Sequence, residues 1–193
     1  MAIKEVEEKK DDNESLNLRH GNISLVLHSY SGIFSDFDPR TYEERGISDD
    51  FLTEVKRAVR ETKGVTELRL LMPAQLRKSH EEIKIKKRLK DYFRKRFKDE
   101  EEKIKKIKKE GIKWFFIGSL ILVISTLLYE YKGRVDSSSF RLLLDFLFII
   151  SQPAGWFTFW EGLGKVFIVS REELPVYDFY KKMSNANIYF LNY

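Results

Sequence analysis

The residues with the clearest potential for chemistry are acidic side chains between positions 36 and 50, namely Asp36, Asp38, Glu43, Glu44, Asp49 and Asp50. Carboxylates at this spacing could bind a divalent cation or act as general acid and base, and Arg40, Tyr42 and Arg45 lie among them. Structural roles explain the same acids, since Asp-Pro opens turns and acids at a helix start are stabilising. Arg40 and Arg45 could pair with these acids or bind a substrate. We favour the structural explanation and predict no catalytic residue and no metal site.

The composition excludes several other classes of site. The 193 residues contain no cysteine, which excludes disulfides, thiolate zinc sites, iron–sulfur clusters and cysteine nucleophiles. The sequence also lacks a glycine-rich phosphate loop, a Gly-x-Ser-x-Gly sequence and a His-Glu-x-x-His sequence. We therefore expect a protein that is not an enzyme and binds no cofactor. The less favoured alternative is a membrane-tethered hydrolase that uses the acidic loop.

Two apolar segments follow each other in the second half of the chain. Residues 112–131 would form about 30 Å of helix, which is the thickness of a bilayer core. Residues 140–160 form a second apolar segment, and only residues 132–139 separate the two. A buried helix of a soluble core could explain one such segment, but two in succession predict a transmembrane helical hairpin.

The distribution of charge predicts the orientation of this hairpin. Residues 77–111 are basic and should form a stalk helix, either continuous with the first span or broken near residues 99–102. Because the connection contains only Lys132 and Arg134, the positive-inside rule places both termini in the cytoplasm, at the inner membrane. Anionic lipid headgroups are the expected partner of the juxtamembrane lysines, and nucleic acid is less favoured because acids interrupt the basic run. These lysines are Lys105, Lys106, Lys108, Lys109 and Lys113.

Polar side chains within the second apolar segment are candidates for an intramembrane role. Asp145 is the one acid in a span, and Arg141 precedes it by four residues on the same helix face. We expect Asp145 to be satisfied within the hairpin, by Arg141 or by the hydroxyls of Ser125 and Thr126. Gln152 lies deeper, beside a proline that should kink the helix. We expect Gln152 to bond to a neighbouring copy in a homo-oligomer.

The first part of the chain has the pattern of a small α/β domain. Alternating apolar residues predict strands within 22–30 and 66–72, and an amphipathic stretch from Ser48 to Gly64 predicts the helix between them. Because two strands make a poor sheet, a third is expected at 186–193, after a short helix. The expected organisation is a disordered leader at 1–18, an α/β head at 19–76, the stalk at 77–111, the hairpin at 112–160, and a tail at 161–193 that completes the sheet of the head.

Two pairs of short motifs add a resemblance to this pattern. One pair is Phe37-Asp38-Pro39-Arg40-Thr41-Tyr42-Glu43-Glu44-Arg45 with Ser48-Asp49-Asp50-Phe51-Leu52, and the other is Trp160-Glu161-Gly162-Leu163 with Phe179-Tyr180-Lys181-Lys182-Met183. These motifs resemble those of uncharacterised small two-span membrane proteins of prokaryotes. The resemblance covers most of the chain and implies its topology alone, with no activity and no catalytic residue.

These observations predict a multi-pass membrane protein with a cytoplasmic α/β domain. We expect it to act as a non-catalytic membrane anchor, scaffold or sensor that binds a cytoplasmic protein whose identity the sequence does not specify. The alternative from another class is an oligomeric pore or effector, in which the spans line a path and the head gates it.

Overall fold

A computed structural model of the chain describes residues 22–62 and 64–193, so the leader expected at 1–18 lies outside the described residues. The chain forms two compact units. The first, which we call the head unit, contains the described part of Met1–Lys98 together with Val176–Tyr193. The second, Asp99–Pro175, we call the hairpin unit.

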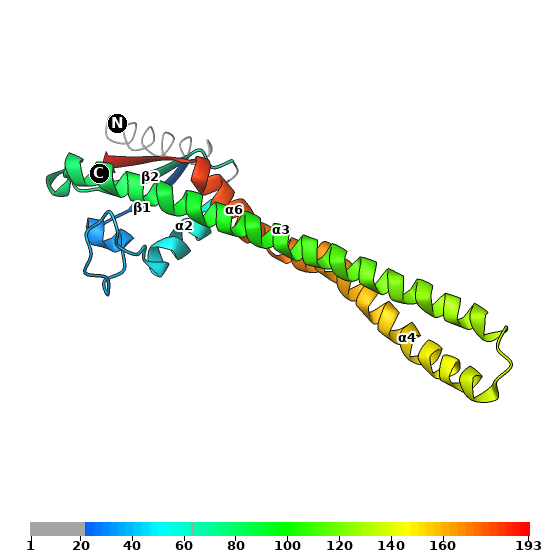
Figure 1. The fold of residues 1–193 in the computed structure, drawn as a ribbon. Helices are drawn as coiled ribbons and strands as arrows, with labels where there is room; N and C mark the ends of the chain where they lie inside the picture. Colours follow the sequence, from blue (N-terminus) through cyan, green and yellow to red (C-terminus); the bar gives the residue numbers. More distant parts are fainter. Residues whose placement is uncertain (1–21, 63) are drawn as a thin grey trace, which may run out of the picture. The chain divides into compact units, whose positions relative to one another are not determined.

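The head unit is built on a parallel three-stranded sheet with the order β1-β2-β3 (Figure 1). Its central strand β2 (Glu67–Met72) pairs with β1 (Asn22–Val26) on one side and with β3 (Asn187–Asn192) on the other. The register places Leu68 between Ile23 and Ile188. The third strand expected near the end of the chain is therefore present, and it completes the sheet.

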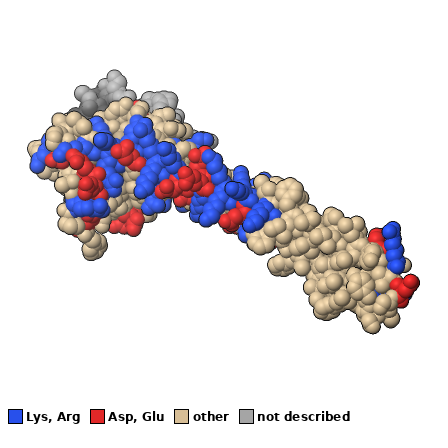
Figure 2. All heavy atoms as spheres, in the orientation of Figure 1, with Lys and Arg blue, Asp and Glu red and all other residues tan. Residues whose placement is uncertain are grey.

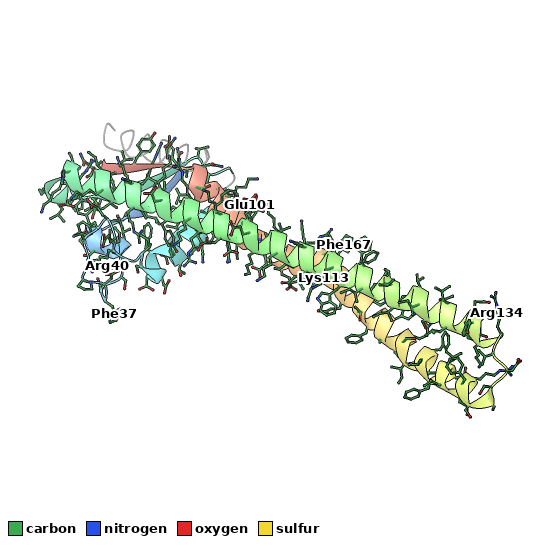
Figure 3. The ribbon with its side chains drawn as sticks, in the orientation of Figure 1. Phe37, Arg40, Glu101, Lys113, Arg134 and Phe167 are labelled. Carbon is green, nitrogen blue, oxygen red and sulfur yellow. The ribbon has the colours of Figure 1, made fainter. Side chains whose placement is uncertain are left out.

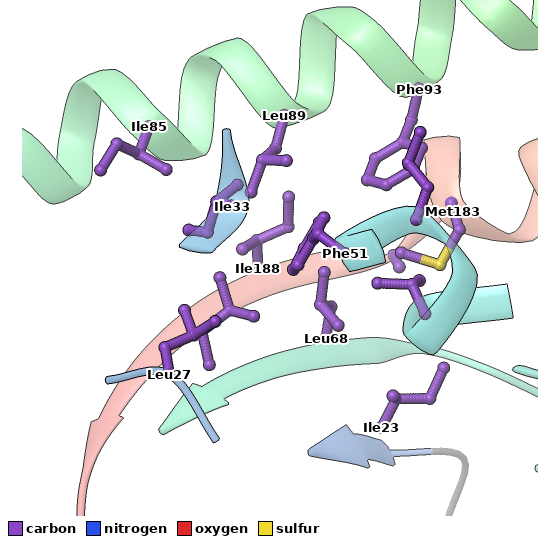
Figure 4. Close-up of a cluster of buried hydrophobic side chains, with 14 of the residues drawn as sticks. Ile23, Leu27, Ile33, Phe51, Leu68, Ile85, Leu89, Phe93, Met183 and Ile188 are labelled. Carbon is purple, nitrogen blue, oxygen red and sulfur yellow. The ribbon is translucent and has the colours of Figure 1, made fainter. Parts of the chain in front are cut away.

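The buried apolar residues of the three strands share one face of this sheet, and helices cover that face. These helices are α2 (Asp49–Glu61), the first part of α3 (Ser79–Lys132) and α6 (Leu174–Asn185). Ile85, Leu89 and Phe93 of α3 are fully buried and point toward the sheet (Figure 4). The first part of the segment expected to form the stalk, up to Lys98, therefore belongs to the head unit.

Local sequence explains where α2 begins and ends. Ser48 occupies the expected N-cap position, but its hydroxyl makes no capping hydrogen bond. Asp49 and Asp50 stand in the first turn, where the helix dipole favours negative charge. Gly64 follows the helix with a φ of 70°, a conformation that glycine adopts without strain.

The hairpin unit consists of the second part of α3, the helix α4 (Ser138–Gly164), a five-residue π-helical segment η3 (Lys165–Val169) and the short α5 (Ser170–Glu172). Because α3 is one helix from Ser79 to Lys132, the alternative with a break near residues 99–102 is wrong. The chain also remains helical beyond residue 160, where the second span was expected to end. Both long helices of this unit are long and apolar enough to cross a membrane.

Candidate functional site

In the hairpin unit, the residues of α3 on its inner face, which packs against α4, recur every seven positions. Ile104, Gly111, Gly118 and Ser125 are buried at this interval, and Lys132 continues the series at the end of the helix. On α4, Gly155 and Gly162 are buried with the same spacing. A strict seven-residue repeat keeps one helix face on its partner when the two helices wind left-handedly around each other.

Glycines on this face let the two helix backbones approach closely. A Cβ atom added to Gly118 would lie 2.4 Å from the backbone nitrogen of Phe159. One added to Gly162 would lie 2.4 Å from the backbone nitrogen of Phe115 and 2.6 Å from the carbonyl oxygen of Gly111. Such spacings leave no room for a side chain, so the contact requires glycine. Small residues of this kind mediate helix packing in lipid, where no hydrophobic drive brings helices together.

A polar cluster occupies the same inner face closer to the connection. The Ser125 side chain is fully buried, the Ser151 hydroxyl lies 2.8 Å from its hydroxyl, and the Gln152 amide donates to it at 3.0 Å. The Gln152 amide, predicted to bond to a neighbouring copy, thus has a partner on the facing helix, and the homo-oligomer stays a prediction. Sequence alone could not place Ser125 at the level of Gln152, because that level depends on how α3 and α4 are aligned.

Asp145 is paired, but with a different partner from those expected. Lys132, the last residue of α3, donates to its carboxylate, and both side chains are about one third exposed. Arg141 instead donates to the backbone carbonyl of Val135 in the connection. Thr126 donates to the carbonyl of Leu122 in its own helix. The predicted partners of Asp145 are thus wrong, because the antiparallel alignment brings the end of α3, and not Ser125, to the level of Asp145.

Asp38 organises the acidic loop between residues 34 and 47 of the head unit. Its carboxylate accepts hydrogen bonds from the Arg40 side chain at 2.7 and 2.9 Å, from the Gly46 backbone at 2.7 Å and from the Arg40 backbone at 3.2 Å. The Arg40 guanidinium, and after it the Gly46 amide, hold the pKa of Asp38 well below its usual range. A backbone bridge between Phe34 and Ile47 closes the base of the loop. Arg40 therefore pairs with an acid of its own loop.

The other candidate residues of this loop also have structural contacts. Arg45 donates to the carbonyl of Ser35 at 2.9 Å, and it is 3.9 Å from the exposed Asp36. Tyr42 stacks on Phe34 with a centroid distance of 5.2 Å. Arg40, Tyr42 and Arg45 share an open pocket of about 310 Å³, near the end of the loop where Figure 3 labels Arg40 and Phe37. Within the described residues, no group of three or more histidine, aspartate or glutamate side chains is placed to hold a metal ion.

Sequence reasoning missed a polar cluster around the buried Glu82 at the carboxyl ends of the strands. Glu82 accepts from Arg77 at 2.8 and 2.9 Å and from the Tyr30 hydroxyl at 3.2 Å. Arg77 also donates to Asn192 at the end of β3, at 2.6 Å. The Arg77 hydrogen bonds lower the pKa of Glu82, whereas burial raises the pKa of Tyr30. In open α/β sheets this edge is where ligands bind, but here these side chains bond to one another and tie β3 to the start of α3.

The juxtamembrane lysines lie on the exposed side of α3. Lys105 pairs with Glu101 at 2.9 Å, and the remaining members of the set are exposed. Figure 2 shows that the charged surface of the hairpin unit gives way to an uncharged one and that charge returns near the connection. The predicted basic and apolar zones thus remain separate in three dimensions. The members of the set are Lys105, Lys106, Lys108, Lys109 and Lys113.

Comparison of the chain with known protein families, with curated proteins and with solved structures finds no match.

Proposed function

We propose that this protein crosses a membrane twice through its hairpin unit and holds its α/β head unit at the cytoplasmic surface as a non-catalytic anchor or scaffold for a protein partner. The observation that carries the proposal is the exposure of the apolar helices. Only 17% of the most apolar stretch of α3, and 11% of that of α4, is buried inside the structure. A core helix of a soluble protein is mostly buried, whereas exposed apolar surface of this extent indicates contact with lipid or another chain.

We call the two apolar segments, 112–131 and 140–160, the apolar zone of the hairpin unit. The polar groups within this zone support lipid as its surroundings. In hydrocarbon every polar group needs an internal partner. Ser119 and Thr158 donate to carbonyls one turn earlier in their own helices, as Thr126 does, and Ser125 is bonded to the facing helix. These hydroxyl groups therefore need no hydrogen bond from water.

The two ends of the apolar zone carry residues suited to a membrane interface. At one end the Lys165 ammonium lies over the Trp114 ring, 5.7 Å from its centroid, and is 3.5 Å from Glu161. At the other end stands the Lys132–Asp145 pair. Tryptophan and snorkelling lysine are enriched at this depth. The distance between these levels corresponds to the 112–131 segment, about 30 Å of helix.

The lysines of α3 support a cytoplasmic head. Residues 97–113 contain seven lysines, whereas the connection contains one lysine and one arginine. The positive-inside rule assigns the lysine-rich side to the cytoplasm. Each lysine near an anionic leaflet contributes about 1 kcal/mol of attraction, so this segment would also hold the protein close to the headgroups.

The acidic loop supports binding in preference to catalysis. The Asp38 carboxylate is held by Arg40 and Gly46, and the Glu43 carboxylate is 3.1 Å from the Lys84 ammonium. A general acid or base needs a pKa near the working pH, yet the Asp38 pKa is shifted away from neutrality. A loop of fixed shape suits recognition of a protein surface.

The proposal can be tested by cysteine labelling, because the chain has no cysteine of its own. Ser137→Cys in the connection and Asn185→Cys at the end of α6 both place the thiol at an exposed position. A membrane-impermeant maleimide should label them from opposite sides of sealed vesicles. Labelling of both from the same side would overturn the two-span topology. Release of the wild-type protein by alkaline carbonate would overturn membrane insertion itself.

A further inference from the structure

The apolar surface of the hairpin unit continues past the interfacial lysine of α4. Phe167, Ile168 and Val169 of η3 are 58%, 62% and 38% exposed, and they follow Lys165 and Val166. The stretch from Phe140 to Val169 is about 45 Å of helix. This length exceeds the hydrocarbon core of about 30 Å and matches the whole bilayer with its headgroup regions.

Contacts between the two helices show what lies beside these three side chains. A Cβ added to Gly111 would be 2.7 Å from the Val166 side chain, so Val166 packs at the level of Gly111. Further along, the Lys103 ammonium is 2.6 Å from the Glu173 carboxylate. Between these two levels α3 carries four exposed lysines, Lys105, Lys106, Lys108 and Lys109. This level of the hairpin unit therefore presents three exposed apolar side chains on one helix and a lysine-rich surface on the other, where Lys105 is paired with Glu101 and Glu110 is exposed beside Lys109.

The π-helical turn explains why the apolar side chains face outward. Ser170 is buried and its hydroxyl donates to the carbonyl of Val166, so both residues belong to the inner face. The wider π turn leaves the whole run 167–169 outside that face. Figure 3 labels Phe167 on η3 and Lys113 on α3.

We infer that η3 and the facing lysines form an interfacial lipid-binding site for anionic phospholipid. Phe167, Ile168 and Val169 enter the boundary between headgroups and acyl chains, while the lysines of α3 bind lipid phosphates. An apolar face beside a lysine-rich face is the pattern by which helices lie in a membrane interface. Lipid is favoured over a protein partner because this surface is continuous with the exposed apolar surface of α4 and because its cationic rim matches anionic headgroups. The inference rests on the proposed function.

The test uses the full chain with a single nitroxide-labelled cysteine, reconstituted in vesicles of phosphatidylglycerol. The label is placed at Phe167, at Phe116 within the span, or at Ser137 in the connection. Collision with oxygen reports lipid, and collision with a water-soluble nickel complex reports water. We expect Phe116→Cys to be oxygen-accessible, Ser137→Cys to be nickel-accessible, and Phe167→Cys to show several-fold less nickel collision than Ser137→Cys, because its side chain enters the boundary between headgroups and acyl chains.

The outcomes separate this inference from the proposed function. Nickel accessibility at Phe167 equal to that at Ser137, with Phe116 still in lipid, would overturn the interfacial site alone. Nickel accessibility at Phe116 would overturn the membrane proposal as well. Ile168→Cys repeats the measurement in case loss of the Phe167 ring itself alters the segment. In phosphatidylcholine vesicles, or after Lys108→Gln with Lys109→Gln, nickel collision at position 167 should rise; an unchanged value would overturn the role of the lysines.

Discussion

Substitution of Gly118 by alanine should force the two helices of the hairpin unit apart. The new methyl group would lie 2.4 Å from the backbone nitrogen and 2.7 Å from the Cα of Phe159. Because non-bonded carbon atoms are best separated by about 3.5–4.0 Å, the backbones must separate by about 1 Å. No side-chain rotation can relieve this contact, since both atoms of Phe159 belong to the main chain.

The expected size of the effect follows from two opposing contributions. Alanine favours a helix over glycine by about 1 kcal/mol. Overpacking a close contact costs about 1–3 kcal/mol, and a gap of about 0.5–1 Å forfeits a quarter to a half of each neighbouring dispersion contact. The separation would also lengthen the hydrogen bond from Gln152 to Ser125, seven residues further along α3. We expect a net destabilisation of about 1–2 kcal/mol.

Tryptophan fluorescence of the protein in mild detergent measures this stability directly, because all three tryptophans, at 114, 156 and 160, lie in the hairpin unit. Gly164→Ala is the matched control. A Cβ there meets nothing within 4 Å, so this variant should melt at or above the wild-type temperature. Equal melting temperatures for Gly118→Ala and Gly164→Ala would refute the role of the close backbone contact.

Three further predictions concern the polar contacts and the sheet. Gln152→Leu should destabilise the hairpin unit by about 0.6–2 kcal/mol in the same fluorescence assay, whereas Thr158→Val, whose hydroxyl bonds only within α4, should change it less; equal effects would contradict the Ser125 bond. Deletion of residues 187–193 should abolish the protease resistance of the head unit, because burial of the Ile188 and Phe190 side chains stabilises the fold by about 1.5–3 kcal/mol each. Unchanged resistance would show that β3 is dispensable. The folded pKa of Glu82 is below its ordinary value of 4.5, so its stabilising contribution is complete above that value and is lost as the pH falls through the lower folded pKa. Acid unfolding followed by circular dichroism should therefore be steeper for wild type than for Glu82→Gln, and parallel curves would contradict this.

The sheet of the head unit could be predicted from the sequence because burial imposes a local pattern on each strand. Leu68, Leu70 and Met72 alternate with more exposed residues, and all three are fully buried. Ile188 and Phe190 repeat this alternation at the end of the chain. Since alternation of this kind is visible within a few residues, the strands and their inward faces needed no knowledge of the rest of the fold.

The partners of the polar residues in the two apolar segments could not be predicted in the same way. The rule that pairs residues four apart operates within one helix, and it selected Arg141 for Asp145. The actual partner, Lys132, is on the facing helix, and its position depends on the alignment of α3 with α4. Glycine contacts fix that alignment. The spacing of Gly111 from Gly118, and of Gly155 from Gly162, is seven in both helices, and that signal could have been recognised in the sequence.

The polar cluster around Glu82 in the head unit had no comparable signal in the sequence. Tyr30, Arg77, Glu82 and Asn192 come from four separate segments that only the completed sheet brings together. Single-residue reasoning therefore identifies paired charges within a loop, such as Asp38 with Arg40, far more readily than a network that joins distant segments.

The two units differ in how many of their large apolar side chains are buried, and this contrast is the strongest physical argument for two different surroundings. In the head unit the fully buried positions are large and apolar, as at Leu68, Leu89 and Phe93. In the hairpin unit glycine and serine are buried beside Ile104 and Leu144, and most large apolar side chains, such as Phe157, are exposed. Water favours the first arrangement because it drives apolar surface inward. Lipid removes that drive and leaves close backbone contact and internal hydrogen bonds to hold helices together. This contrast supports the proposal that lipid surrounds the hairpin unit while water surrounds the head unit.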